Sequence, residues 1–139
     1  MKRVITILIL LYFFISCSTP KKASNEIDNF NGVWIPVQQE LGGQPLPASA
    51  FANQKLSISD TTYIFVAEST DKGIVKYNHH KMDIYGKEGV NTGKHFTAIY
   101  KLEKGQLFIC YNLKGNAYPS SFDTKSGPAL FLSVFKKIQ

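Results

Sequence analysis

Residues 95–112 read HFTAIYKLEKGQLFICYN and carry the clearest structural signal in the chain. Apolar side chains recur at every second position from Phe96 to Leu102, and again from Leu107 to Tyr111. A period of two places such side chains on one face of a β-strand. The link between the two runs, Lys104-Gly105, is short enough for a tight hairpin turn. The stretch therefore predicts two antiparallel strands with a shared buried face.

The chain beyond residue 29 continues this pattern, with short runs rich in Val, Ile, Phe, Tyr and Thr between Gly, Asn, Asp and Lys. These runs predict an antiparallel β protein, because parallel strands would need crossovers of a dozen residues or more. A short helix is expected over residues 47–53, where Pro47 stands near the start. The expected strands are Val33–Glu40, Lys55–Ser59, Tyr63–Glu68, Gly73–Asn78, Lys81–Tyr85, His95–Glu103, Gln106–Asn112 and Ala129–Lys137.

Eight sequential strands with hairpin links leave two unpaired edges, and closing the sheet removes both. The expected fold is therefore all-β, an antiparallel up-and-down eight-stranded barrel over residues 29–139. At eight strands, the interior holds either packed side chains or one small ligand. The last strand is apolar on both sides, since Phe131 and Phe135 fall opposite Leu132. We therefore expect another element, or the N-terminal tether, to cover its outer side.

Short motifs connect the chain to a known family. Gly32 and Trp34 form the Gly-x-Trp pattern that lipocalins and their bacterial relatives carry at the start of the first strand. This pattern and several further motifs occur in order along the chain. With them, the chain resembles a family of small secreted bacterial lipocalin-like domains, first catalogued as a repeated domain in planctomycetes. The further motifs are Glu40–Pro47, Asp71–Ile74, Met82–Ile84, Asn91–Lys94, Ala98–Tyr100, Leu107–Tyr111 and Pro119–Phe122.

The resemblance covers about residues 29–137 and implies a lipocalin-like barrel in which Gly32 and Trp34 close one end. It implies no particular ligand. Tyr118 stands where the family usually has an Arg. No role that depends on a positive charge at that position is therefore carried over.

The N-terminal segment predicts export. Lys2 and Arg3 precede an apolar run over residues 4–15. As a helix this run would extend about 18 Å, whereas a membrane's hydrocarbon core is about 30 Å thick. The run is therefore too short for a membrane span and matches a secretory signal.

The end of this signal resembles a lipobox, the cleavage motif of bacterial lipoproteins. A small residue, Ser16, directly precedes Cys17, although Phe14 replaces the usual Leu. The resemblance implies cleavage before Cys17 and lipidation of that residue, giving a signal peptide over 1–16, a tether over 17–28 and the barrel over 29–139. Ser18 after the cysteine implies an outer-membrane position facing the periplasm. The alternative is an ordinary signal peptide that ends at a chance cysteine.

Charge argues against nucleic acid as a partner. Without residues 1–16, the chain keeps 14 basic and 10 acidic residues, a net charge of +4, and every basic residue is Lys. Arg supplies the planar fork that recognises phosphate and guanine, so its absence is unusual in a nucleic-acid surface. The lysines are also scattered, which is typical of a solvated face. Lys21 and Lys22 would add a weak attraction to anionic lipid.

The sequence predicts no catalytic, cofactor or metal site. It contains neither a Gly-x-Ser-x-Gly motif nor paired carboxylates at a fixed spacing. Residues 88–94 hold two glycines and a Lys but lack the ending of a phosphate loop, so we expect a hairpin loop there. His79 and His80 would point to opposite faces of a strand, so at most one could join His95, and no zinc set is complete. Cys110 is expected as a lone buried thiol.

Asp83 is the most informative charged residue in the expected strands. It lies between two apolar residues, so its carboxylate points away from them. Inside a barrel it would need a hydrogen-bond partner; the alternatives are a solvent-facing carboxylate and a structural hydrogen bond. The candidate ligand-contacting residues are Asp83, Tyr100, Tyr111 and Tyr118.

Two functions remain open at this point. The first is a lipid-anchored binding module of the cell envelope that holds a small, largely apolar ligand in its barrel. The alternative is a non-catalytic envelope protein, such as an inhibitor or assembly factor, that binds another protein through loops 42–54, 86–94 and 113–128. An enzyme that uses Asp83 or His95 is not expected.

Overall fold

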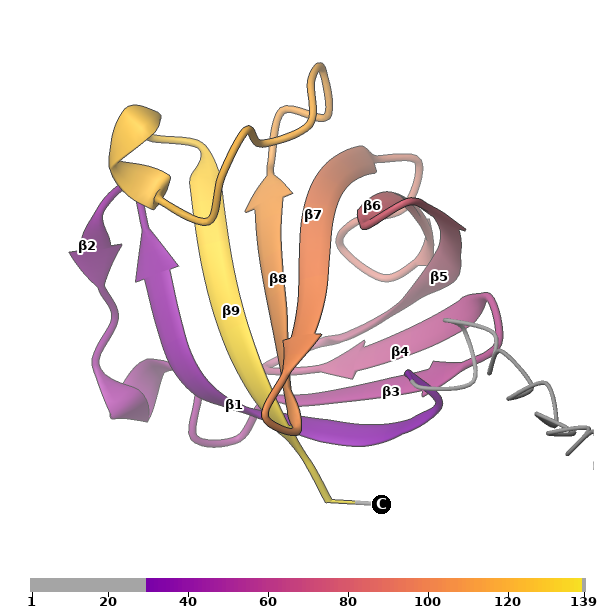
Figure 1. Cartoon of the computed structure of the whole chain (residues 1–139). Coiled ribbons are helices and arrows are strands. Elements are labelled where there is room, and N and C mark those ends of the chain that lie inside the picture. The colour runs from indigo at the N-terminus through magenta and orange to yellow at the C-terminus, as the bar shows by residue number, and fades with distance from the viewer. Residues whose placement is uncertain (1–29, 139) are drawn as a thin grey trace, which may run out of the picture.

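The computed structural model describes residues 30–138 (Figure 1). The predictions for the signal peptide, Cys17 and the tether lie outside these residues. No helix among the described residues is long and apolar enough to cross a membrane. The strands are β1 (Gly32–Leu41), β2 (Gln44–Pro45), β3 (Lys55–Ser59), β4 (Thr62–Val66), β5 (Thr70–Asn78), β6 (Lys81–Glu88), β7 (His95–Glu103), β8 (Gln106–Asn112) and β9 (Leu130–Lys137).

The strands form a closed antiparallel barrel, which confirms the predicted fold class. Each strand from β3 to β9 pairs with its neighbour in sequence. β1 closes the sheet, because its first residues pair with β3 and its longer second part pairs with β9. The short strand β2 lies outside the eight-stranded barrel and pairs only with the end of β1.

The expected strand positions are largely confirmed. Three strands, β3, β7 and β8, have the predicted bounds. The strands β1, β4, β5, β6 and β9 differ from the prediction by one to three residues at one or both ends, and the two-residue strand β2 was not predicted. The short helix expected over residues 47–53 is present but shorter, as a 3-10 helix over Ala48–Ala50. Pro47 precedes that turn without a side-chain cap, and a single turn lacks the length at which an α-helix becomes stable.

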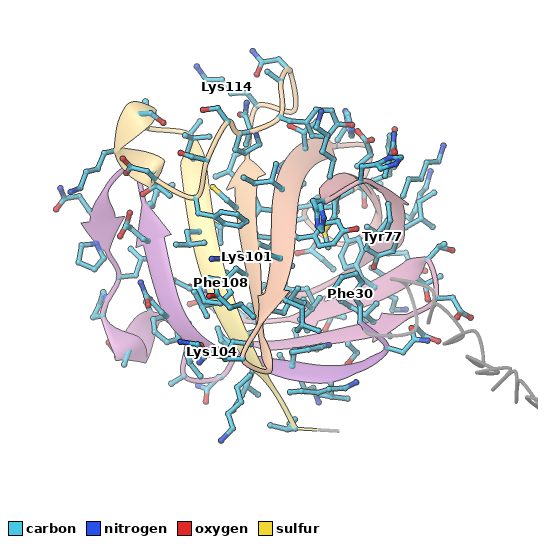
Figure 2. The ribbon with its side chains drawn as sticks, in the orientation of Figure 1. Phe30, Tyr77, Lys101, Lys104, Phe108 and Lys114 are labelled. Carbon is cyan, nitrogen blue, oxygen red and sulfur yellow. The ribbon has the colours of Figure 1, made fainter. Side chains whose placement is uncertain are left out.

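The two ends of the barrel differ. Three two-residue turns, Asp60-Thr61, His79-His80 and Lys104-Gly105, lie at one end, which we call the closed end. The longer connections, residues 42–54, 67–69, 89–94 and 113–129, lie at the other, which we call the loop end. In Figure 2, Lys104 and Lys114 mark the closed end and the loop end, respectively. All three loops that the sequence predicts as a rim therefore share one end.

Aromatic side chains fill the closed end. Phe30, Trp34 and Tyr100 are almost fully buried. The Trp34 Nε1–H donates a hydrogen bond to the Phe30 carbonyl oxygen at 2.8 Å. The Phe30 ring packs edge-on against Tyr100 and stacks on Tyr77, with centroid separations of 5.0 and 5.5 Å (Figure 2). Gly32 and Trp34 thus lie at the closed end of the barrel.

The outer face of β9 is covered, as its apolar pattern predicts. Leu132, Val134 and Cys110 form a second buried cluster outside the barrel interior. Phe122, from the 113–129 loop, packs against this cluster. The covering element is thus this loop, whose Phe122 ring approaches Phe108 edge-on at 6.5 Å.

The two adjacent histidines lie in the link that the expected strands leave between Asn78 and Lys81, so the expectation that they point to opposite faces of a strand does not apply. His79 and His80 form the turn between β5 and β6, with positive φ angles of 45° and 62°. Tyr77 pairs with Met82 and Asn78 pairs with Lys81 across the hairpin, which leaves only two residues for the turn. A two-residue turn between twisted strands favours positive φ at both positions.

Candidate functional site

The barrel encloses a cavity of about 490 Å³. Its wall is mainly apolar, with aliphatic side chains such as Leu56, Val75 and Ile84 between aromatic rings. It extends to the loop end, because Lys94 and Leu113, both exposed, also line it. The aromatic residues in the wall are Tyr63, Phe65, Tyr77, Phe96, Tyr111, Phe131 and Phe135.

The period-two pattern brings these side chains together. On each strand, every second side chain faces the interior. Closure of the barrel directs these side chains from all eight strands toward one axis. Gly73 in β5 makes local room for Tyr63, because a Cβ atom there would lie 2.6 Å from the Tyr63 ring and 2.1 Å from the Tyr85 carbonyl oxygen. A larger residue at position 73 would therefore displace the Tyr63 ring.

Three phenol groups line this cavity: Tyr63 from β4, Tyr77 from β5 and Tyr111 from β8. Burial raises the pKa of Tyr77 to about 12. Burial also raises the pKa of Tyr63, with a smaller effect from the charge of Asp71. The pKa of Tyr111 is raised first by burial and then by the proximity of Tyr63 and Tyr77. All three are therefore neutral hydrogen-bond donors at ordinary pH.

Tyr77 differs from the other phenols in one respect. Its hydroxyl is buried and has no hydrogen-bond partner within residues 30–138. Buried polar groups nearly always have a partner, and an unpaired one costs free energy. The Tyr77 hydroxyl is therefore an unpaired donor that the surrounding side chains enclose.

The polar groups at the mouth, in contrast, are paired with one another. The buried Asp71 carboxylate accepts hydrogen bonds from the Asn91 backbone N–H at 3.0 Å and from Asn91 Nδ2 at 3.1 Å. Lys94 Nζ donates to Asn91 Oδ1 at 3.1 Å. Farther round the wall, the Gln39 amide donates to Gln54 and Ser133. These pairs fix the shape of the mouth and leave its two charges balanced.

The four predicted ligand-contacting residues are divided between the two faces of the barrel. Tyr111 lines the cavity, and Tyr100 lies in the aromatic closed end. Asp83 and Tyr118 lie outside. The interior position considered for Asp83 is wrong, because Met82 and Ile84 face inward and the residue between them must face outward.

On the outer face, Asp83 belongs to a separate polar cluster. Its carboxylate accepts a hydrogen bond from the Tyr118 hydroxyl at 2.6 Å and contacts His95 Nε2 at 2.7 Å. Burial alone would raise the pKa of Asp83, but the hydrogen bonds from Tyr118 and His95 and the nearby charge of Lys76 lower it overall. The cluster links β6, β7 and the 113–129 loop, so its geometry is that of a structural contact.

Sequence reasoning missed Tyr63, Tyr77 and Asp71. The signal for the first two is present, because each shares a strand face with an apolar residue of the core, Tyr63 with the partly buried Phe65 and Tyr77 with the buried Val75. No group of three or more metal-ligating side chains is found in the described part of the chain. His95 is held by Asp83, and the other two histidines lie in the closed-end turn.

A scan against models of known protein families finds no match for the chain, and a search of curated proteins finds no similar sequence.

Proposed function

We propose that this protein is a lipid-anchored, lipocalin-like binding module of the cell envelope that holds a small, largely apolar ligand inside its barrel. The cavity carries this proposal. Its volume of about 490 Å³ falls within the range of roughly 300–1,000 Å³ typical of small-molecule sites. An apolar wall favours an apolar ligand, because each Å² of apolar surface removed from water contributes about 25 cal/mol.

The proposed anchor belongs to the N-terminal segment. Cys17 would carry the lipid, and residues 18–29 would connect it to the closed end of the barrel, where Phe30 lies. Twelve residues reach at most about 40 Å when extended. A connection at the closed end leaves the cavity mouth, at the opposite end, accessible to a ligand from the periplasm. Binding, not catalysis, is the activity we propose.

Filling the cavity tests the binding proposal. We expect the Ile84→Trp variant to bind the neutral fluorescent probe N-phenyl-1-naphthylamine at least tenfold more weakly than wild type, because the indole would occupy cavity space. Ile64→Trp is the matched control, since Ile64 is 41% exposed on the outer face. Circular dichroism would verify that both variants fold. Equal probe binding by wild type and the folded Ile84→Trp variant would contradict the proposal.

A protein-binding role for the rim has one observation in its favour. Val90 in the 89–94 loop and Leu113 in the 113–129 loop are 66% and 43% exposed at the loop end. Exposed apolar residues on neighbouring loops are typical of interaction sites. Crosslinking from a photoreactive amino acid at position 90, with position 104 at the closed end as control, would detect a specific partner of the loop end.

A further inference from the structure

Positive charge is concentrated at the closed end of the barrel. Residues 30–138 contain twelve lysines and eight acidic residues. Near the closed end, Lys101 and Glu103 neutralise each other through an ion pair of 2.6 Å. Apart from this pair, the closed end has four exposed lysines and one exposed carboxylate, a net charge of +3, whereas the rest of the described chain is almost balanced. The four lysines are Lys81, Lys104, Lys136 and Lys137, and the carboxylate is Asp60.

Strand pairing brings two of these lysines close together. Lys104 lies in the turn between β7 and β8, and Gln106, two residues later, pairs with Lys136 of β9. Lys137 follows, with its Nζ 5.4 Å from the centre of the Trp34 ring at the same end of the barrel. Within the described residues, no ion pair joins Lys104, Lys136 or Lys137 to a carboxylate. Their ammonium groups are therefore available to an anionic partner.

Two exposed apolar side chains lie among these lysines. Leu102 is 44% exposed, because it continues the inward-facing side of β7 beyond the buried Tyr100. Ile138 is 51% exposed, and its backbone N–H bonds to the Val33 carbonyl oxygen at 2.8 Å. Lysines around exposed apolar side chains are typical of surfaces that lie on an anionic membrane, where the ammonium groups meet lipid phosphates.

The path of the chain favours a membrane over a soluble anionic partner. Phe30, the first described residue, lies at the closed end, so the proposed anchor at Cys17 would hold this end near the lipid surface. Salt screens the attraction of exposed lysines beyond about 8 Å at physiological ionic strength. By themselves these lysines bind weakly, but an anchor raises their effective concentration at the membrane.

We infer that the closed end is a docking surface for a membrane containing anionic phospholipids, with its lysines against the phosphates and Leu102 and Ile138 in the headgroup layer. The inference rests on the proposed lipid anchor and adds the orientation of the anchored barrel. The closed end lies on the membrane, and the cavity mouth points away from it.

Vesicle binding by the mature chain with Cys17→Ser, which removes any acyl chain, tests this surface. We expect it to sediment at low ionic strength with vesicles of equal parts phosphatidylcholine and phosphatidylglycerol, but not with phosphatidylcholine alone. High salt should release it, because the attraction is electrostatic. Failure to bind the anionic vesicles at low ionic strength would overturn the inference.

Paired substitutions locate the surface. In the same chain, Lys104→Gln with Lys136→Gln should weaken binding to the anionic vesicles about tenfold or more, as the loss of two lysines near an anionic surface allows. The matched control is Lys87→Gln with Lys114→Gln, which removes the same charge from exposed positions at the loop end and should have little effect. Ile138→Ser should weaken binding roughly threefold, because less apolar surface leaves water.

Equal binding to both vesicle types, equal losses in the two lysine pairs, or unchanged binding of Ile138→Ser would each overturn the inference. These outcomes leave the proposed function intact, because probe binding in the cavity and lipid at Cys17 are measured separately. A wild-type N-terminal peptide without lipid would instead refute the anchor on which the orientation rests.

Discussion

Tyr77 buries a hydroxyl group without a hydrogen-bond partner in residues 30–138, and such a group lowers the stability of the ligand-free barrel. We predict that Tyr77→Phe raises the free energy of unfolding by about 1 kcal/mol, because it removes the unpaired hydroxyl and keeps the stacked ring. Urea unfolding followed by the fluorescence of Trp34, the single Trp, measures this change. A variant less stable than wild type would show that the hydroxyl has a stabilising contact.

Asp83 gives the barrel a pH-dependent contribution to stability. Its folded-state pKa is lowered, despite burial, by hydrogen bonds from Tyr118 and His95. A group with a lowered folded-state pKa stabilises the protein above its unfolded-state pKa, near 3.9 for Asp, and this contribution disappears as pH falls through the folded-state value.

We therefore predict that Asp83→Asn costs about 1 kcal/mol at pH 7 and that the difference from wild type shrinks below about pH 4. Chemical unfolding across this pH range measures both quantities. Glu68→Gln, which changes an exposed carboxylate, serves as the control. A difference for Asp83→Asn that does not depend on pH would contradict the pKa shift.

Among the elements, the 113–129 loop shields the apolar cluster on the outer side of the barrel from solvent. Thr97 Oγ1 donates a hydrogen bond to the Ala117 carbonyl oxygen at 2.6 Å, which ties the loop to β7. Phe122 then packs against the cluster that contains Cys110, whose free thiol is buried. Burial, with a smaller effect from Glu40, raises the pKa of Cys110 to about 11, so this thiol should react slowly while the loop is in place.

We predict that Phe122→Ala lowers stability by about 2 kcal/mol and accelerates the reaction of Cys110 with a thiol reagent at pH 8, because the loop loses its apolar contact. The measurement uses a chain with Cys17→Ser, so that Cys110 is the sole thiol. Val90→Ala, in a different loop, should leave the rate unchanged. Equal rates for Phe122→Ala and wild type would show that another element protects the thiol.

At the scale of the whole molecule, attachment and folding should be separable. We predict that Cys17→Ser moves the protein from the membrane fraction to the soluble fraction, because two or more acyl chains are needed for stable anchoring. The thermal unfolding midpoint of the barrel should stay the same, since Cys17 lies outside residues 30–138. Cell fractionation measures the change in location. Mass spectrometry of the wild-type N-terminal peptide shows whether it carries lipid. A wild-type peptide without lipid would refute the anchor.

Fold class was predictable because strand pattern and link length are local properties of the chain. The alternation in His95–Glu103 and the two-residue link at Lys104-Gly105 suffice to define that hairpin. The site was predictable only in part. Tyr111, one of the predicted ligand-contacting residues, lines the cavity. Tyr63 and Tyr77 line it too but were not predicted, because nothing local distinguishes a phenol that lines a cavity from one that packs in a core.

The sequence by itself determined the strands, their antiparallel order and the need to close the sheet, since these follow from a period of two and from unpaired edges. Only the tertiary structure decided which face of each strand is the interior. Alternation identifies two faces of a strand but does not show which one points to the interior. On β9 both faces are apolar, with Phe135 inside and Leu132 outside. Closure of the sheet selects the interior face, because the side chains of that face converge on the barrel axis. This convergence places Asp83 outside the barrel and the Tyr77 side chain within it.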